Sequence, residues 1–331
     1  MKYVLGIDQG GSKTHAVVAD EAGCLLGMGK SYGACHSSSS LEYALHAIVQ
    51  ASDAALEQAG ICREDVTTLV GGLTGVDWDY EAELLENSIK TYFPGADIQV
   101  VNDCIIAMRA DTRKSQCGIL CAGSGLNCAV QDGEDCFVYG FYIPDEYQGG
   151  SSLGKKAVQA VFDSYVGLER ETSLTGRLLD YFQVKTANEL LYMQVKDQIS
   201  VEAYLKIPMI LAEEAEAGDN VAADIWIRYG KHIVKYLTAR VKKMGLQGKE
   251  MDIVLSGGIF KCKFRKFRMV VKEEILSKIP DANIIEAQFE PVVGAAVMGL
   301  WRIPGEVTED IYENMKVSSI KFPVKRLEEF H

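Results

Sequence analysis

Gly6-Ile7-Asp8-Gln9-Gly10-Gly11-Ser12-Lys13-Thr14 joins the end of one short β-type run to the start of another. A carboxylate stands at the strand end, two glycines follow whose backbone N–H groups can approach an anion, and hydroxyl and ammonium groups come next. The glycine spacing fits neither a Walker A loop nor a dinucleotide fingerprint, because a strand rather than a helix follows. The pattern predicts a phosphate-binding loop, with a plain hairpin turn as the alternative.

The same arrangement of strand, glycine turn and strand occurs a second time. Residues 2–7, 14–19 and 24–28 predict an antiparallel meander, and residues 118–122 and 127–130 echo it around Gly123-Ser124-Gly125. We therefore expect Gly123, Ser124 and Gly125 to form a second phosphate loop, and the chain to be an α/β protein with an internal duplication. A hairpin turn is again the alternative for this loop taken by itself.

Helical periodicity fills the rest of the chain. Apolar residues recur at helical spacing between residues 41 and 59, and a long apolar stripe runs from Val221 to Met244. The strand expected at 252–255 ends in Ser256-Gly257-Gly258, where Gly257 and Gly258 could let a flat base lie against the backbone, although a simple strand-to-helix turn is the alternative. A length of 331 residues suggests two domains.

Composition limits the partners and the compartment. Acidic residues exceed basic ones by 46 − 34 = 12, which argues against nucleic acid or anionic lipid as the main partner. The nine cysteines show neither disulfide nor zinc spacing, and the N-terminus is charged too early for a signal peptide. No apolar run approaches the ~20 residues that span a bilayer. We expect a cytoplasmic protein with a small-molecule partner, no nucleic acid and no membrane, and leave a homodimer open.

Two carboxylates stand where chemistry is expected. Asp103 follows the strand 98–101 and precedes a helix, so it could cap that helix, act as a general base for an alcohol nucleophile, or do both. Asp8 could hold Mg²⁺ through water near the phosphates, or be a solvated turn carboxylate. The basic and aromatic run 260–268 is better explained as an amphipathic helix with buried Phe side chains than as a nucleic-acid patch, since the chain is acidic.

Taken together, these loops and carboxylates resemble the actin-like ATPase superfamily, and within it the N-acetylglucosamine kinase and BadF/BadG/BcrA/BcrD ATPase family. Residues 6–14 resemble the family's first phosphate motif, 123–128 its second, 256–260 its adenosine motif and 291–296 its returning C-terminal helix. The resemblance covers nearly the whole chain.

This resemblance implies two α/β domains of the duplicated ribonuclease H type, each with a mixed sheet flanked by helices, and ATP in the cleft between them. The first domain would comprise residues 1–115 with the returning helix at about 291–305, and the second residues 116–290. Gly10, Gly11, Ser12, Lys13 and Thr14 would bind phosphates together with the second loop, and Gly257 and Gly258 would bind adenosine. Asp103 would be the base, Asn127 would touch the sugar, and Asp8 would hold Mg²⁺.

The chain departs from the family pattern on the acceptor side. Cys35 stands where the family usually has an Asn after the third strand, so one donor to the sugar is lost. The family's Gly-Asp-Glu-Gly-Ser stretch is replaced by residues 144–150, which places Glu146 at the family's Asp, or Asp145 if the loop shifts by one residue. A site that lacks one hydrogen-bond partner can lose orders of magnitude in selectivity.

The sequence thus predicts an ATP- and Mg²⁺-dependent kinase that phosphorylates a hydroxyl of N-acetylglucosamine or a related amino sugar. One alternative is an ATPase that energises an electron-transfer or dehydratase partner through an iron–sulfur cluster, for which Cys104 and Cys128 are the candidate ligands. A second alternative is a non-catalytic nucleotide or sugar sensor, because the acceptor pocket has changed.

Overall fold

The computed structural model describes residues 1–303 and 308–322, and these form two compact units. Unit 1 comprises Met1–Lys114 and the described residues from Ile285 onward, and unit 2 comprises Ser115–Ile284. Unit 2 is therefore inserted into unit 1 in the sequence. No helix within the described residues is long and apolar enough to cross a bilayer.

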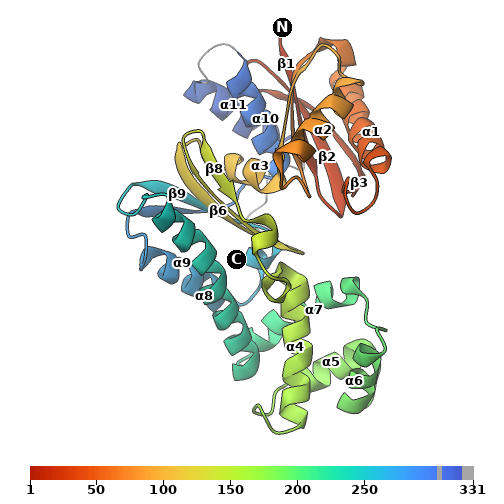
Figure 1. The fold of residues 1–331 in the computed structure, drawn as a ribbon, viewed down its shortest axis with the longest axis vertical. Helices are drawn as coiled ribbons and strands as arrows, with labels where there is room; N and C mark the ends of the chain where they lie inside the picture. Colours follow the sequence, from red (N-terminus) through yellow and green to blue (C-terminus); the bar gives the residue numbers. More distant parts are fainter. Residues whose placement is uncertain (304–307, 323–331) are drawn as a thin grey trace. The chain divides into compact units, whose positions relative to one another are not determined.

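Unit 1 is built on a five-stranded mixed sheet with the strand order β3-β2-β1-β4-β5. The first three strands are an antiparallel meander, as the sequence predicted, and β4 and β5 continue the sheet parallel to β1 (Figure 1). The strands are β1 (Tyr3–Gln9), β2 (Lys13–Asp20), β3 (Leu25–Tyr32), β4 (Val66–Leu73) and β5 (Asp97–Asn102).

Helices cover both faces of this first sheet. Leu5 and Ile7 of β1 pack in the core with α1 and α2, whereas Val4 faces the core that contains α10, as the two-residue alternation of a strand requires. The small residues of α10 allow close packing, because a Cβ on Gly6 would lie only 2.7 Å from the backbone nitrogen of Ala296. The helices are α1 (Leu41–Ala59), α2 (Asp79–Lys90), α3 (Asp103–Arg109), α10 (Pro291–Arg302) and α11 (Glu309–Ser319).

Unit 2 repeats the same strand plan. Its sheet has the order β10-β9-β6-β7-β8, in which β6, β7 and β8 form an antiparallel meander and β9 lies parallel to β6. The strands are β6 (Gln116–Ala122), β7 (Leu126–Asp132), β8 (Asp135–Val138), β9 (Met251–Ser256) and β10 (Ala282–Glu286). The predicted α/β duplication is thus confirmed: two mixed sheets with the same connectivity, each flanked by helices.

Unit 2 differs from unit 1 in its large helical part. The stripe predicted on α8 is buried, including Val221, Ile225, Ile233 and Leu237, so truncating Ile233 to Ala should cost about 2–5 kcal/mol of stability. The helices are α4 (Gly149–Tyr165), α5 (Leu174–Phe182), α6 (Ala187–Val195), α7 (Val201–Glu216), α8 (Asn220–Lys243) and α9 (Arg265–Leu276).

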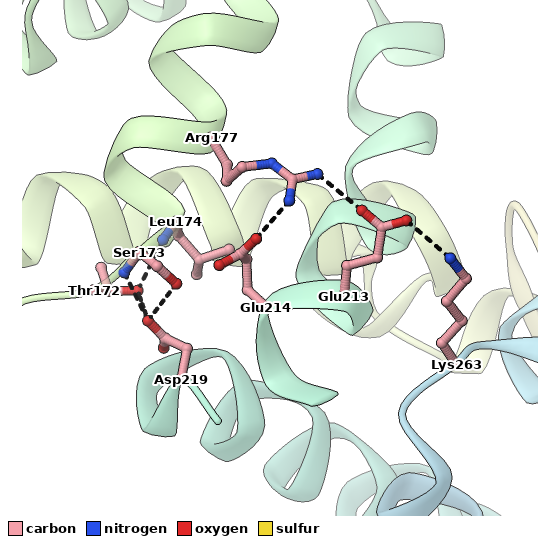
Figure 2. Close-up of polar contacts among 8 residues, drawn as sticks. All are labelled: Thr172, Ser173, Leu174, Arg177, Glu213, Glu214, Asp219 and Lys263. Atoms are coloured by element: carbon pink, nitrogen blue, oxygen red, sulfur yellow. Dashed lines mark hydrogen bonds and ion pairs between the residues drawn. The ribbon is translucent and has the colours of Figure 1, made fainter. Parts of the chain in front are cut away.

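A polar network fixes α5 against α7 and α8 (Figure 2). Arg177 reaches Glu213 at 2.8 Å and Glu214 at 2.7 Å, and Lys263 pairs with the other oxygen of Glu213 at 3.3 Å. Asp219 accepts hydrogen bonds from the Ser173 amide and from the Thr172 hydroxyl, and it also caps α8. Because Arg177, Lys263 and the two glutamates pair with one another and Asp219 is hydrogen-bonded to backbone and hydroxyl groups, the network is structural.

The basic and aromatic run is part of the same packing. Phe260, Phe264 and Phe267 are buried, and Arg268 donates hydrogen bonds to the carbonyl oxygens of Phe260 and Cys262. The Phe side chains are buried as predicted, but the helix begins only at Arg265, because residues 258–261 form a separate 3₁₀ turn.

Candidate functional site

Three parallel strands of unit 1 end in register at one edge of the sheet. Gln9 of β1 lies opposite Leu73 of β4, and Leu73 lies opposite Asn102 of β5. The loops that follow are tied together, since the Thr74 amide donates to the Gln9 carbonyl oxygen at 2.8 Å. Ligands of open α/β sheets bind at the carboxyl ends of the strands, so this edge is the candidate site.

The first predicted phosphate loop connects β1 to β2 at this edge. The Gly10 amide donates to the Lys13 carbonyl oxygen at 2.9 Å, and Gly11, Ser12 and Lys13 are exposed. A Cβ on Gly11 would meet no described atom within 4 Å, and neither Gly10 nor Gly11 has a positive φ. Packing and backbone conformation therefore do not require these glycines, which leaves the close approach of a ligand to the backbone as their explanation.

Lys13 and Thr14 face different surroundings. The Lys13 ammonium lies 3.1 Å from the Glu290 carboxylate, at the start of α10. Thr14 is fully buried, and its hydroxyl donates to the Tyr32 carbonyl oxygen at 2.7 Å. Thr14, predicted to bind phosphate, thus uses its hydroxyl to hold β2 against β3, whereas Ser12 and Lys13 remain available to a ligand.

Asp8 is buried rather than solvated, which corrects the alternative of a turn carboxylate. It is 7% exposed and lies within β1, on the strand face that it shares with Val4 and Gly6. Its partner across the meander is His15, whose pKa burial and the nearby Lys13 and Lys30 lower to about 4. The neighbouring imidazole is therefore neutral at physiological pH.

Asp103 is the first residue of α3, and its helix cap is Asn102 rather than Asp103 itself. The Asn102 side-chain oxygen accepts from the Cys104 amide at 3.0 Å, so the predicted capping role belongs to the preceding residue. Asp103 is half-buried, and burial raises the pKa of its carboxyl to about 6. The Asp77 carboxylate adds to this rise, and hydrogen bonds from the Cys104 amide and the Thr74 hydroxyl oppose it.

The loop before α2 joins Asp103 to the Cys35 segment. Asn102 donates to the Val76 carbonyl oxygen at 3.0 Å and to Asp77 at 3.4 Å. Glu81, which is buried, accepts from the Asp77 amide at 2.9 Å and lies 3.5 Å from the His36 ring nitrogen. A chain of polar contacts therefore runs from His36, next to Cys35, through Glu81 and Asp77 to Asn102, next to Asp103.

Cys35 lies directly beside the loop that follows β4. Its sulfur lies 3.5 Å from the Thr74 carbonyl oxygen and 3.2 Å from the Ser37 hydroxyl. Burial acts to raise the pKa of the Cys35 thiol, but hydrogen bonds from Ser37 and Ser38 outweigh burial, and the net shift is downward. The thiol is half-buried, and its pKa lies below that of an ordinary cysteine.

In unit 2 the second predicted phosphate loop follows β6. The Gly123 amide donates to the Gly125 carbonyl oxygen, and the Gly150 amide donates to the Gly123 carbonyl oxygen, both at 2.8 Å. No described atom lies within 4 Å of a Cβ on Gly123, whereas one on Gly149 would collide with the Gly125 backbone. Gly123 is thus free to approach a ligand, while Gly149 is required by the packing of α4 on this loop.

Gly257 and Gly258, the third glycine pair, also differ in whether packing requires a glycine. Gly257 has a φ of 104°, and a Cβ there would collide with the backbone of Ala122, so this glycine is structural. A Cβ on Gly258 would meet no described atom within 4 Å. The loop after β9 is therefore packed against the loop after β6, and Gly258 leaves open backbone beside it.

The remaining predicted acceptor residues are all in unit 2. The Asn127 side-chain oxygen accepts from the Cys128 amide at 2.8 Å and the Gly140 amide at 3.0 Å, so it holds the following turn. Asp145 and Glu146 are exposed in the 3₁₀ turn Asp145–Tyr147 and line a cavity of about 640 Å³ together with Lys155.

The cysteines give no support to an iron–sulfur cluster. Cys104 is 1% exposed in α3 and Cys128 is 0% exposed in β7, so neither thiol is on a surface that a second subunit could reach. All nine cysteines are free thiols. Within the described ranges, 1–303 and 308–322, no group of three His, Cys, Asp or Glu side chains is arranged to hold a metal ion.

Sequence analysis missed four polar residues of this site: Thr74, Asp77, Glu81 and His36. The signal for the first two was the sequence Thr74-Gly75-Val76-Asp77, which places polar groups directly after a buried β-type run. Gly75 has a φ of 78°, which marks the tight turn that brings this loop to Cys35. Nothing in the sequence indicated that Glu81, a residue of a helix, would be buried against His36.

The sequence of this chain is similar to those of known proteins. A family model described as the BadF/BadG/BcrA/BcrD ATPase family matches residues 5–299. The N-acetylmuramic acid/N-acetylglucosamine kinase of Clostridium acetobutylicum is 25% identical over 309 residues, 90% of this chain and 98% of that protein. The glucosamine kinase of Vibrio cholerae is 27% identical over 237 residues, 68% of this chain and 78% of that protein.

A solved structure shows the same fold. The structure of a candidate N-acetylglucosamine kinase from Chromobacterium violaceum superimposes with a TM-score of 0.67, at 18% identity, over 90% of this chain and 99% of that one.

Proposed function

This chain belongs to the BadF/BadG/BcrA/BcrD ATPase family, and on that premise we propose that it is an ATP-dependent kinase that phosphorylates a hydroxyl of N-acetylglucosamine or a related amino sugar. The names of the two curated relatives support an amino-sugar acceptor. The observation that carries the proposal is Asp103: a half-buried carboxylate at the ligand-binding edge of the sheet, with its pKa raised to about 6.

Asp103 is assigned the role of general base. A base works best when its pKa lies just below the operating pH, because it is then deprotonated yet still accepts a proton readily. A carboxylate with a pKa of about 6 meets this condition near pH 7, whereas an ordinary Asp is a weaker base. Asp103 would take the proton from the acceptor hydroxyl as that oxygen attacks the γ-phosphorus and ADP leaves.

The glycine loops are assigned to ATP. The backbone of Gly10–Lys13, with Ser12 and Lys13, and the backbone of Gly123–Gly125, with Ser124, would bind phosphate oxygens, and Gly258 would border the adenosine. The open space around Gly11, Gly123 and Gly258 supports this assignment. Asp8 fits a magnesium ion held through water, since Mg²⁺ uses one or two carboxylates plus substrate phosphates rather than a full cage of protein ligands. Bound Mg²⁺ would neutralise phosphate charge.

The acceptor is assigned to Cys35, Asn127, Asp145 and Glu146, with Thr74 and Asp77 beside Cys35. Cys35 supports a relative of N-acetylglucosamine as substrate, because a thiol is a weaker hydrogen-bond partner than the Asn expected there. We place the reaction in the cytoplasm, where nine free thiols remain reduced.

ADP release from Mg·ATP tests the proposal, measured with N-acetylglucosamine, glucosamine, N-acetylmuramic acid, glucose and glycerol, and without acceptor. We expect release that depends on an amino sugar and that Asp103→Asn abolishes. Release that no acceptor stimulates would instead support an ATPase that drives a partner. No release with any acceptor would support a sensor, and either result would overturn the kinase proposal.

A further inference from the structure

A second cavity lies within unit 2 between α4 and α8, and it shares Lys156 and Gln159 with the cavity that Asp145 and Glu146 line. Its volume is about 370 Å³, within the range of small-molecule sites. Tyr147, Lys156 and Asp163 contribute to one side and Ile225, Arg228 and His232 of α8 to the other. None of these side chains has a role in the proposed phosphoryl transfer, so the chemistry of the cavity needs its own explanation.

The cavity contains charges that the protein does not pair. Within the part of the chain that the structure describes, neither Lys156 nor Arg228 forms an ion pair with a carboxylate. Asp163 accepts a hydrogen bond from Gln159 at 2.8 Å but meets no cation there. Glu169, the other carboxylate of the lining, is already paired with Arg170 at 3.3 Å. The cavity therefore presents two unpaired cations and one unpaired carboxylate.

The rest of the lining is aromatic and apolar. The Tyr147 and His232 rings stack in parallel, with centroids 3.4 Å apart, and the Lys156 ammonium lies 5.0 Å from the Tyr147 ring. Burial and the nearby Lys235 lower the pKa of His232, so its ring is neutral at pH 7.5 and adds no charge. Ile225 gives the opposite wall an apolar surface.

We propose that this cavity binds a small phosphate monoester that also carries an ammonium group. The phosphate, with a charge near −2, complements Lys156 and Arg228, and the ammonium complements Asp163. An amino acid would leave one cation unmatched, and a phosphate ester without nitrogen would leave Asp163 unmatched. The unpaired charges thus favour a phosphate ester with an ammonium group over both, and an amino-sugar phosphate is one such compound.

The position of Tyr147 connects this cavity to the acceptor residues. Tyr147 ends the 3₁₀ turn that carries Asp145 and Glu146, so a ligand packed on the Tyr147 ring contacts that turn directly. This consequence rests on the proposed function: where the acceptor is an amino sugar with a free amine, the phosphorylated product would carry the required ammonium group, bind here and raise the KM for the acceptor. The binding itself does not depend on catalysis.

Isothermal titration calorimetry of the full chain, without ATP, tests the proposal. The probe is glucosamine 6-phosphate, compared with glucosamine, glucose 6-phosphate and inorganic phosphate, each in the presence of excess N-acetylglucosamine to occupy the acceptor site. We expect glucosamine 6-phosphate to bind most tightly. Arg228→Gln and Asp163→Asn should each weaken its binding by about 10- to 100-fold, because each removes a charged hydrogen bond.

Lys231→Gln is the matched control, because Lys231 is an exposed cation of α8 that does not line the cavity. It should bind the probe like the wild type. Equal loss in Lys231→Gln and Arg228→Gln would show a general charge effect and overturn the proposal. Binding that Arg228→Gln leaves intact would place the probe in the acceptor site, with the same consequence. A chain without kinase activity that still binds the probe through Arg228 would refute the proposed function alone.

Discussion

The two units share one strand plan but place different chemistry at its carboxyl ends. In unit 1 the loops after β1, β4 and β5 bring together carboxylates, with Asp8 at the end of β1, Asp77 after β4 and Asp103 after β5. In unit 2 the loop after β6 consists of Gly123, Ser124 and Gly125, and the segment after β9 begins with Gly257 and Gly258, so neither brings a carboxylate. Backbone amides without nearby carboxylates favour an anion, whereas a group of carboxylates favours proton transfer and metal binding. The two units thus share a fold but present different chemical groups at the ends of their strands.

The largest expected effect comes from replacing Asp103. Asp103→Asn keeps the shape of the side chain but cannot accept a proton, so kcat should fall about 10²- to 10⁴-fold with little change in the KM for ATP. Asp79→Asn, at an exposed position of α2, is the control and should retain full activity. Steady-state kinetics with the best acceptor measures both, and undiminished turnover in Asp103→Asn would remove the base role.

A substitution at a ligand-facing glycine of unit 2 should change the KM for ATP alone. Gly123→Ala meets no described atom, so the fold should be kept while the KM for ATP rises about tenfold and the KM for the acceptor stays constant. Gly149→Ala should instead lower the Tm, because its φ of 48° and the Gly125 backbone exclude a Cβ. Thermal denaturation and KM measurements separate the two effects. A change of acceptor KM in Gly123→Ala would break the contrast between the units.

Cys35 tests whether acceptor choice is made in unit 1. Cys35→Asn should raise kcat/KM for N-acetylglucosamine by about tenfold, since it restores a side chain with both donor and acceptor groups. Cys35→Ser is the control for removing the thiol without adding an amide. If both variants lower the preference for N-acetylglucosamine equally, the thiol itself recognises the acceptor.

A smaller effect is expected in the pH profile. Because Asp103 must be deprotonated to act, kcat/KM should rise with pH up to about 6 and then level off. Asp77→Asn removes a carboxylate that raises the pKa of Asp103, so the acidic limb should move to lower pH. Profiles between pH 4.5 and 8 for both proteins measure the shift, and an unmoved limb would show that Asp77 does not act on the base.

The smallest effect concerns stability. The pKa of Asp103 is raised in the folded protein, so its ionisation opposes folding, fully so above about pH 6 and not at all below its ordinary value near 4. Asp103→Asn should therefore raise the Tm of the protein by about 2 °C at pH 7.5 and leave it unchanged near pH 4. Calorimetry at the two pH values measures the difference, and a lower Tm at pH 7.5 would contradict the pKa assigned to Asp103.

The sequence predicted the sheets because the glycine turns and the β-type runs are local signals. It also predicted that Asp8 would lie at the end of one strand and Asp103 directly after another, since both strands are recognisable in the sequence. It could not predict that the Thr14 hydroxyl would donate to the Tyr32 carbonyl oxygen, or that Asn102 would cap α3 in place of Asp103. Both hydrogen bonds depend on where the side chains lie relative to backbone groups in the folded protein. The contact between Glu81 and His36 joins two distant segments and has no periodic signal at all.

The return of the chain to unit 1 has a consequence for synthesis. Gly6 and its neighbours on β1 pack against α10, which begins only at Pro291, so a nascent chain has made all of unit 2 before the face beside Asp8 can be covered. Domains generally fold as their chains emerge, so unit 2 can become native first, whereas unit 1 must wait for α10. Unit 1, which carries Asp8 and Asp103, is thus the later of the two units to complete its core. A chain released before α10 is made would lack the helix that packs on β1 and α3.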